Sequence, residues 1–431
     1  MYSLVRSINR SVAGVGLPAV AAFSVYTCMY AFRKPFTVAD YGTLTFAGID
    51  YKIWLVIAQT VGYTISKFAG IRIVAGLQTR TRARGIIGLI FTGWAALFCF
   101  AFIPAPWNIL CLLLNGIPLG MVYGLVFSYL EGRKNTELLG AVLACSFIFA
   151  SGFAQNTGKW LLTLQGVSAW WMPFLTGLFF FPPLIFFTWL LDKTPSPTKA
   201  DMESRTIRQP MNKNDRRKFI KTFLPGLLLL IVTYVLLTVV RDYRSNFAAE
   251  IWKETGFGKN AAVFSQSEIP ASLVVLLLMG LLAFVRSSIQ AFFINHLLIV
   301  TGLLLVLGCT FLFTEGRLPV FWWMTLTGVG LYMGYVPFNC MLFERLIAAF
   351  RYVSNAGFII YVADSFGYLG SNLILLMKNF MHIEISWTGF FIKMILISGI
   401  AGILLIILSA AYFSKKYKNY YSRTLTSHRY A

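Results

Sequence analysis

The sequence predicts an all-α, polytopic membrane protein with twelve transmembrane helices in two pseudo-symmetric groups of six. Three observations lead to this fold class. Hydrophobic residues make up 58% of the 431 residues and charged residues only 12%, a composition too apolar for an ordinary soluble domain. Apolar stretches long enough to cross a bilayer core of about 30 Å recur along the whole chain. A single long polar segment divides these stretches into two equal sets.

The twelve apolar stretches are expected to be the transmembrane helices, because a helix needs about 20 residues to cross the hydrocarbon core. The first stretch follows the basic segment MYSLVRSINR, but no small-residue cleavage site separates it from Tyr26, so we expect it to remain as a helix. The approximate bounds are 12–34, 51–75, 85–104, 107–130, 138–164 and 168–191 for the first six, and 222–247, 260–285, 290–314, 318–343, 353–380 and 386–413 for the last six.

The distribution of basic residues predicts the orientation in the membrane. The chain has 37 lysines and arginines against 16 acidic residues. When loops are assigned to alternate sides, 25 of the 37 fall on the side that holds both termini, which is the positive-inside pattern of cytoplasmic loops. We therefore expect both termini in the cytoplasm and the chain in a bacterial inner membrane. Nucleic acid is excluded as a partner, because no loop is large enough to form a basic module with stacking aromatic residues.

The polar segment 192–221 predicts the division into domains. It contains nine basic and four acidic residues and three prolines, with almost no apolar periodicity, so it is expected to be a cytoplasmic linker. The N-terminal bundle is then 1–191, the C-terminal bundle 222–413 and the cytoplasmic tail 414–431. Glycine pairs at Gly116 and Gly120, and at Gly330 and Gly334, indicate that the halves repeat one another. Parallel repeats place a substrate cavity at their interface.

Cysteine and histidine residues indicate neither a metal site nor an enzyme. The six cysteines all lie inside predicted helices without the spacing of metal ligands, so they are expected to be small buried hydrophobic residues. The three histidines are scattered along the chain and form no catalytic cluster. We therefore expect no metal, no cofactor and no catalytic residues.

Two arginines at matching places in the two halves are the leading candidates for a substrate site. Arg33 ends the apolar stretch that follows Gly14, and Arg241 ends the stretch that follows Leu224; each comes seven residues after a tyrosine, Tyr26 or Tyr234. Seven residues are close to two helical turns, so tyrosine and arginine share a face. An arginine at membrane depth costs at least about 3 kcal/mol and needs a polar cavity, a partner or an anion. The alternative is that Arg33 ends its helix and extends to the outer headgroups, which we expect of Lys34 in any case.

Several segments resemble the organophosphate:phosphate antiporters, a branch of the major facilitator superfamily that includes the glycerol-3-phosphate and hexose-phosphate carriers. The segment from Tyr26 to Arg33 and Lys34, with Tyr30 between, is similar to the signature of that family's first helix. Further similar segments are Gly62-Tyr63-Thr-Ile-Ser66-Lys67-Phe68, Val239-Val240-Arg241, Trp252-Lys253-Glu254, Phe366-Gly367-Tyr368-Leu369-Gly370 and Asp192-Lys-Thr-Pro-Ser196. The resemblance implies the major facilitator fold.

The resemblance also implies roles for individual residues. In that family the arginines of the first and seventh helices hold the phosphate from opposite sides of the cavity, and here these are Arg33 and Arg241. Arginine suits this role, because a planar guanidinium binds phosphate oxygens through two hydrogen bonds. Lys67, Tyr30 and Tyr63 would supply further donors, with Tyr26 and Tyr234 on the same faces as the arginines. The tyrosines are equally explained as residues of the aromatic belt at the membrane interface.

The sequence departs from that family in ways that bear on the substrate. The position of a fifth-helix histidine holds Phe149, and the loop from Ile71 to Gly76 lacks the acid that would latch the inward gate. Three acidic residues, Asp242, Glu268 and Asp364, fall inside or beside predicted helices. Buried carboxylates pair with a cation or titrate. They would then form structural ion pairs, line the cavity wall, or neutralise an arginine and couple transport to protons.

We therefore expect a monomeric transporter, in contact with the lipid bilayer, that moves a small anionic metabolite by alternating access. A phosphorylated metabolite, exchanged for phosphate, is the first expectation. One alternative is a transporter-derived receptor that binds such an anion without net flux. The other is a proton-coupled transporter of a less charged solute.

Overall fold

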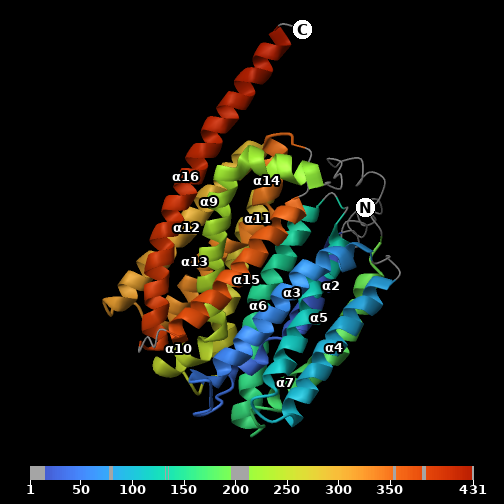
Figure 1. Ribbon diagram of the computed structural model, residues 1–431, viewed down its shortest axis with the longest axis vertical. Helices are drawn as coiled ribbons and strands as arrows, with labels where there is room; N and C mark the ends of the chain where they lie inside the picture. Colours follow the sequence, from blue (N-terminus) through green and yellow to red (C-terminus); the bar gives the residue numbers. More distant parts are fainter. Residues whose placement is uncertain are drawn as a thin grey trace, which may run out of the picture.

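The computed structural model describes residues 15–76, 81–131, 133, 135–195, 213–352, 356–380 and 385–429. These residues form a nearly all-helical body in which the helices of the first half lie beside those of the second half (Figure 1). The first half contains α2 (Leu17–Tyr30), α3 (Tyr51–Gly76), α4 (Arg82–Phe102), α5 (Ile109–Leu130), α6 (Thr136–Leu164) and α7 (Met172–Asp192). The second half contains α9 (Lys213–Asn246), α10 (Ala248–Glu254), α11 (Val263–Ala283), α12 (Ser288–Thr314), α13 (Val320–Cys340), α14 (Leu342–Ala349), α15 (Ala356–Phe380) and α16 (Trp387–Arg429).

Each of the twelve predicted spans contains one long helix. Among the described residues, nine helices are long and apolar enough to cross a membrane, and α13 makes a tenth if it is taken together with α14, to which it is joined by a bend of 48°. The helices at the two remaining predicted spans, α3 and the 14-residue α2, are not among these. Large apolar side chains such as Phe311, which is 61% exposed, cover the outside of the bundle, as expected of helices that face lipid.

The first helix ends earlier than predicted. We expected it to continue to 34, but α2 ends at Tyr30, and Arg33 lies in the turn that follows, with its main-chain N–H donating to Tyr30 at 3.0 Å. Pro35 explains the difference, because proline has no N–H to donate to the carbonyl of Ala31 and its ring clashes with that carbonyl in a continued helix. A short 3₁₀ helix, η2 (Pro35–Val38), and a hairpin of β1 (Thr45–Phe46) and β2 (Ile49–Asp50) then lead to α3.

The polar segments predicted outside the membrane are partly helical. α9 already begins at Lys213, within the predicted linker, whose residues 196–212 lie outside the described residues. α16 continues through the predicted tail to Arg429 and projects beyond the body (Figure 1). Residues 403–429 contain neither glycine nor proline, so nothing in this sequence interrupts the helix where the apolar stretch ends.

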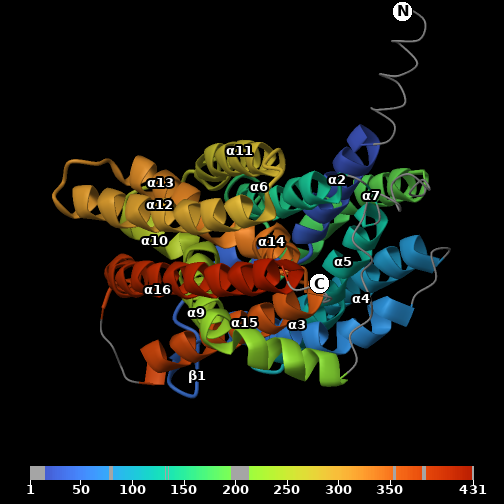
Figure 2. The same ribbon diagram turned by 90° about the horizontal axis from the view of Figure 1, so that it is seen from above.

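Helices of the two halves meet along a central interface. In the first half α3 packs on α5, and in the second half α9 packs on α15 and α16. Contacts between the halves join α6 to α11 and α3 to α15, and the view from above shows α6 beside α11 (Figure 2). The interface therefore runs between α3 and α6 on one side and α11, α13 and α15 on the other.

Replacing Gly116 with alanine is expected to destabilise the protein by about 1–3 kcal/mol, the usual cost of overpacking. An added Cβ would lie 2.2 Å from the main-chain oxygen of Gln59 and 3.0 Å from the main-chain nitrogen of Tyr63. Because both atoms belong to the backbone of α3, they cannot move aside without separating the two helices. Unfolding in mixed detergent micelles measures the loss.

Gly88→Ala in α4 is the matched control, since its added Cβ would meet no atom within 4 Å. Alanine favours a helix over glycine by about 1 kcal/mol, so this variant should be as stable as the native protein or slightly more so. Equal effects of the two substitutions would show that close packing of α3 on α5 does not matter.

Candidate functional site

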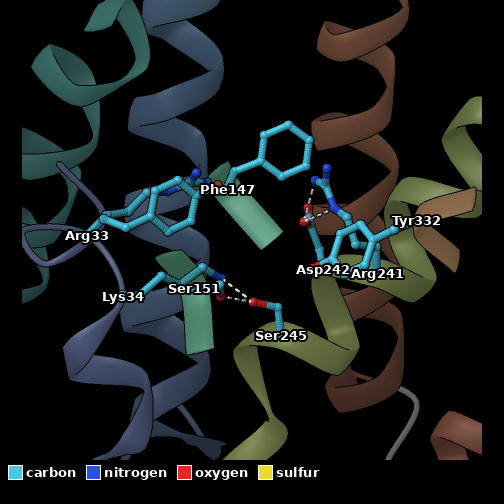
Figure 3. A pocket seen from close by; sticks show the side chains of 9 residues that line it. Arg33, Lys34, Phe147, Ser151, Arg241, Asp242, Ser245 and Tyr332 are labelled. Carbon is cyan, nitrogen blue, oxygen red and sulfur yellow. Dashed lines mark hydrogen bonds and ion pairs between the residues drawn. The ribbon is translucent and has the colours of Figure 1, made fainter. Parts of the chain in front are cut away.

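A small cavity of about 20 Å³ lies at the interface of the two halves, enough for about one water molecule. The first half contributes Tyr30, Arg33 and Lys34 from the end of α2 and Phe147 and Ser151 from α6; the second contributes Arg241, Asp242 and Ser245 from α9 and Tyr332 from α13. Figure 3 shows the side chains of the two halves facing each other across this space. The structure thus brings Arg33 and Arg241 to one cavity, as expected from their matching positions.

Arg33 is buried, with 8% of its surface exposed, and does not extend to the headgroups. Its guanidinium lies over the ring of Tyr63 at 3.9 Å and near the ring of Tyr30 at 5.7 Å. Its Nε has no hydrogen-bond partner, and no acidic side chain pairs with it among the described residues. A buried guanidinium without an acidic partner is a donor available to an anion.

Arg241 is largely buried, with 11% of its side chain exposed, but it is paired. Its Nη2 and Nε donate to Oδ1 of the neighbouring Asp242 at 2.6 and 3.2 Å, and its guanidinium lies over the ring of Tyr335 at 3.9 Å. The second carboxylate oxygen of Asp242 is buried without a hydrogen-bond partner. Asp242 therefore neutralises Arg241 in this conformation, which was one of the roles expected for the buried acids.

The expectation that Lys34 extends to the outer headgroups was wrong. Instead of extending to the outer headgroups, Lys34 is 5% exposed, and its Nζ donates to Oγ of Ser245 at 2.8 Å and to Oδ1 of Asn246 at 2.6 Å in the other half. The expectation assumed a helix through residue 34, whereas the chain turns after Tyr30 and directs Lys34 inward. Pro35, which cannot continue a helix, was the signal in the sequence that could have revealed this turn.

Lys67 and Asp364 form a second polar cluster between α3 and α15, outside the cavity lining. Nζ of Lys67 lies 3.1 Å from Oδ2 of Asp364. The ammonium is surrounded by the rings of Tyr63, Tyr123 and Tyr361 at 5.4–5.6 Å. This ion pair joins the two halves and is shielded from water, since the exposed fractions of the two side chains are 6% and 9%.

The remaining predicted tyrosines connect this cluster to the cavity. The hydroxyl of Tyr234 donates to Asp364 and lies 2.8 Å from the hydroxyl of Tyr335. The guanidinium of Arg241 lies over the ring of Tyr335. Tyr26 packs edge-on against Tyr30 and Tyr123, with ring centroids 5.5 Å apart in each pair.

Of the seven predicted binding residues, only Tyr30, Arg33 and Arg241 line the cavity. The other four, which are Tyr26, Tyr63, Lys67 and Tyr234, do not line it.

Glu268 forms an ion pair with Arg244, a residue that was not predicted to belong to the site. Nη1 of Arg244 lies 2.5 Å from Oε1 of Glu268, and its Nη2 donates to the main-chain oxygen of Met324 at 2.9 Å. Arg244 is three residues beyond Arg241 on α9 and therefore lies close to the same face. That spacing is the signal by which it could have been found.

Polar contacts join the two halves on both sides of the cavity. Toward the end that carries α10, Lys52 pairs with Glu250, Asp40 pairs with Lys253, and Gln155 donates to the main-chain oxygen of Ser245. At the end where α16 projects, Arg345 of α14 pairs with Glu137 at the start of α6, at 2.6 Å. Ionic contacts between described residues therefore hold the two halves together at both ends of the interface.

The pair of Asp40 and Lys253 predicts a dependence of stability on pH. The hydrogen bond from Lys253 lowers the pKa of Asp40 below 3.8, so this stabilisation is present above pH 3.8 and is lost as the pH falls through the folded-state value. The pKa of Lys253 is raised above 10.5 by the same hydrogen bond, so its share is lost only as the pH rises through the raised value. Thermal unfolding of Asp40→Asn should differ slightly from that of the native protein between about pH 5 and pH 9, and the difference should vanish in strong acid. A difference that is unchanged at about pH 2 would contradict this assignment.

Comparisons with known proteins identify a family and a fold. Residues 35–416 match a family of unknown function (DUF5690). No curated protein matches the sequence. Among solved structures, a D-xylose-proton symporter superposes with a TM-score of 0.62 over 92% of this chain and 96% of that chain, at 13% sequence identity. An identity this low establishes similarity of fold alone. The chain therefore belongs to the DUF5690 family and has the major facilitator fold.

Proposed function

We propose that this protein is a secondary transporter that moves a small phosphate monoester across the membrane by alternating access. The observation that carries the proposal is the charge of the central cavity. With Lys34 protonated, Arg33, Lys34 and Arg241 contribute three positive charges and Asp242 contributes one negative charge. The sum is two positive charges, which would balance the two negative charges of a phosphate monoester dianion. Burial strengthens the attraction between such charges, because the effective dielectric constant is lower than in water.

The distribution of the cationic side chains over the two halves also suits a movement of one half against the other. Arg33 and Lys34 belong to the first half and Arg241 to the second, so a single anion between them would attract both. Such an anion promotes closure only if it binds the closed state more tightly than the open states. In major facilitators the two halves rock about a site at their interface, and the cavity occupies that place.

The finer features of the proposal rest on the sequence. Similarity to the organophosphate:phosphate antiporters supports exchange for inorganic phosphate, with Arg33 and Arg241 holding the phosphoryl group. The excess of basic residues on one side supports a bacterial inner membrane with both termini in the cytoplasm. The D-xylose-proton symporter shares the fold, but its sugar gives no support for a neutral substrate here, because the cavity contains three cationic side chains.

Counterflow in proteoliposomes tests the proposal. Vesicles loaded with inorganic phosphate are given labelled glycerol phosphate or hexose phosphate, with labelled xylose as a neutral control. We expect uptake of a phosphorylated compound that requires internal phosphate. Binding of the phosphorylated compound without uptake would favour the receptor. Uptake that requires a proton gradient and not phosphate would favour the proton-coupled alternative.

A further inference from the structure

The lipid-facing side of α16 changes from apolar to basic at one end of the bundle. Its exposed residues Ile397, Ile400, Leu404 and Leu408 follow one another at intervals of three or four residues and so form one stripe. The same spacing continues through Ala411 to two exposed lysines, Lys415 and Lys418. The stripe that faces the acyl chains therefore ends in cations on the same face of the helix.

α9 shows the same change in the opposite chain direction. Leu228 and Leu224 are 57% and 50% exposed, and the stripe continues toward the start of the helix to exposed Lys221 and Arg217. These residues are again three or four apart, so they share the face that contacts lipid. Two neighbouring helices thus carry basic residues directly above an apolar, outward-facing surface.

Contacts between the helices place these cations at one level. Nζ of Lys416 donates to the main-chain oxygen of Thr222 at 2.5 Å, so Lys415 on α16 lies at the level of Lys221 on α9. Below this contact, Gly226 lies against the ring of Phe413. Packed helices have axes about 8–10 Å apart, a distance that long side chains from both can span toward one ligand.

Aromatic side chains surround this level. Rings from α9, α16 and the end of α14 contact one another in a cluster made up of Phe219, Phe223, Phe350, Tyr352, Phe413, Tyr417 and Tyr420. The four phenylalanines are buried between the helices, whereas Tyr420 is 40% exposed, and tyrosine is enriched where the hydrocarbon meets the headgroups. The four cations therefore lie at headgroup depth.

We propose that Arg217, Lys221, Lys415 and Lys418 form a binding site for the phosphate of an anionic phospholipid, whose acyl chains lie along the apolar stripes of α9 and α16. None of the four has an acidic partner among the described residues. Anionic headgroups attract basic residues placed beside a transmembrane helix in this way. The bound lipid would hold α9 and α16 together at the level where α16 leaves the membrane.

Lipid binding by charge variants tests this site independently of transport. The test variant is Lys221→Gln with Lys415→Gln, and native mass spectrometry from mixed micelles measures retention of phosphatidylglycerol against phosphatidylcholine. We expect affinity for phosphatidylglycerol to fall by about 30-fold, the factor for about 1 kcal/mol per basic residue. Affinity for phosphatidylcholine should be unchanged.

Two controls separate a site from general charge. Arg84→Gln with Arg286→Gln removes two exposed basic residues from other helix ends and should leave phosphatidylglycerol binding unchanged. Lys221→Arg with Lys415→Arg keeps both charges and should bind as the native protein does, which also shows that substitution here permits folding. Equal losses in the two glutamine variants, or retention of lipid in both, would overturn the proposal. Displacement of the lipid by an equal concentration of inorganic phosphate would do so too, since it would show a site for the free ion.

Discussion

Replacing Arg33 with alanine is expected to lower counterflow of the phosphate monoester by about 100-fold. Arg33 is the buried guanidinium of the cavity that has no acidic partner among the described residues, so the substrate would be its counterion. Removing one partner of a buried, hydrogen-bonded charge pair costs about 3 kcal/mol, which corresponds to that factor. The measurement is the initial rate of counterflow in proteoliposomes containing equal amounts of folded protein.

Arg286→Ala is the matched control, because Arg286 is exposed beyond the end of α11 and does not line the cavity. Its counterflow should equal that of the native protein. Arg33→Lys should recover part of the rate, since the charge remains but the paired hydrogen bonds of the guanidinium are lost. Full counterflow by Arg33→Ala would exclude Arg33 from the site and contradict the proposed binding of an anion between Arg33, Lys34 and Arg241.

Replacing Asp364 with alanine is expected to lower the free energy of unfolding by about 3 kcal/mol. The substitution leaves Lys67 as a buried cation without its carboxylate and removes the acceptor of the Tyr234 hydroxyl. Breaking a buried ion pair from one side costs about 3–5 kcal/mol, because the remaining charge has lost its hydration without gaining a partner. Unfolding in mixed detergent micelles measures the change.

The double variant Lys67→Met with Asp364→Leu distinguishes the ion pair from simple packing. Removing both charges should restore most of the stability, because an apolar pair of similar size costs little in a buried site. Glu315→Ala, which removes an exposed carboxylate at the end of α12, should change stability by less than about 1 kcal/mol. Equal losses in the single and double variants would mean that the charges of Lys67 and Asp364 do not stabilise each other.

The sequence could identify only those residues of the candidate site whose importance is evident within a single helix. Arg33 and Arg241 stood out because a charge at membrane depth is costly wherever the helix packs. Lys34 was misplaced because its direction depends on a turn that begins after Tyr30. Arg244 was passed over because its importance comes from Glu268, a residue of another helix.

The apolar composition and the number of helical spans could be predicted from the amino-acid sequence alone. These follow from the free energy of moving each segment into lipid, which depends on local composition. The packing of the helices decided which distant polar groups meet: Asp364 with Lys67, and Lys34 with Ser245 and Asn246 across the interface. Pairing depends on distances of a few ångströms between residues far apart in the chain, and those distances are set by how the two halves pack.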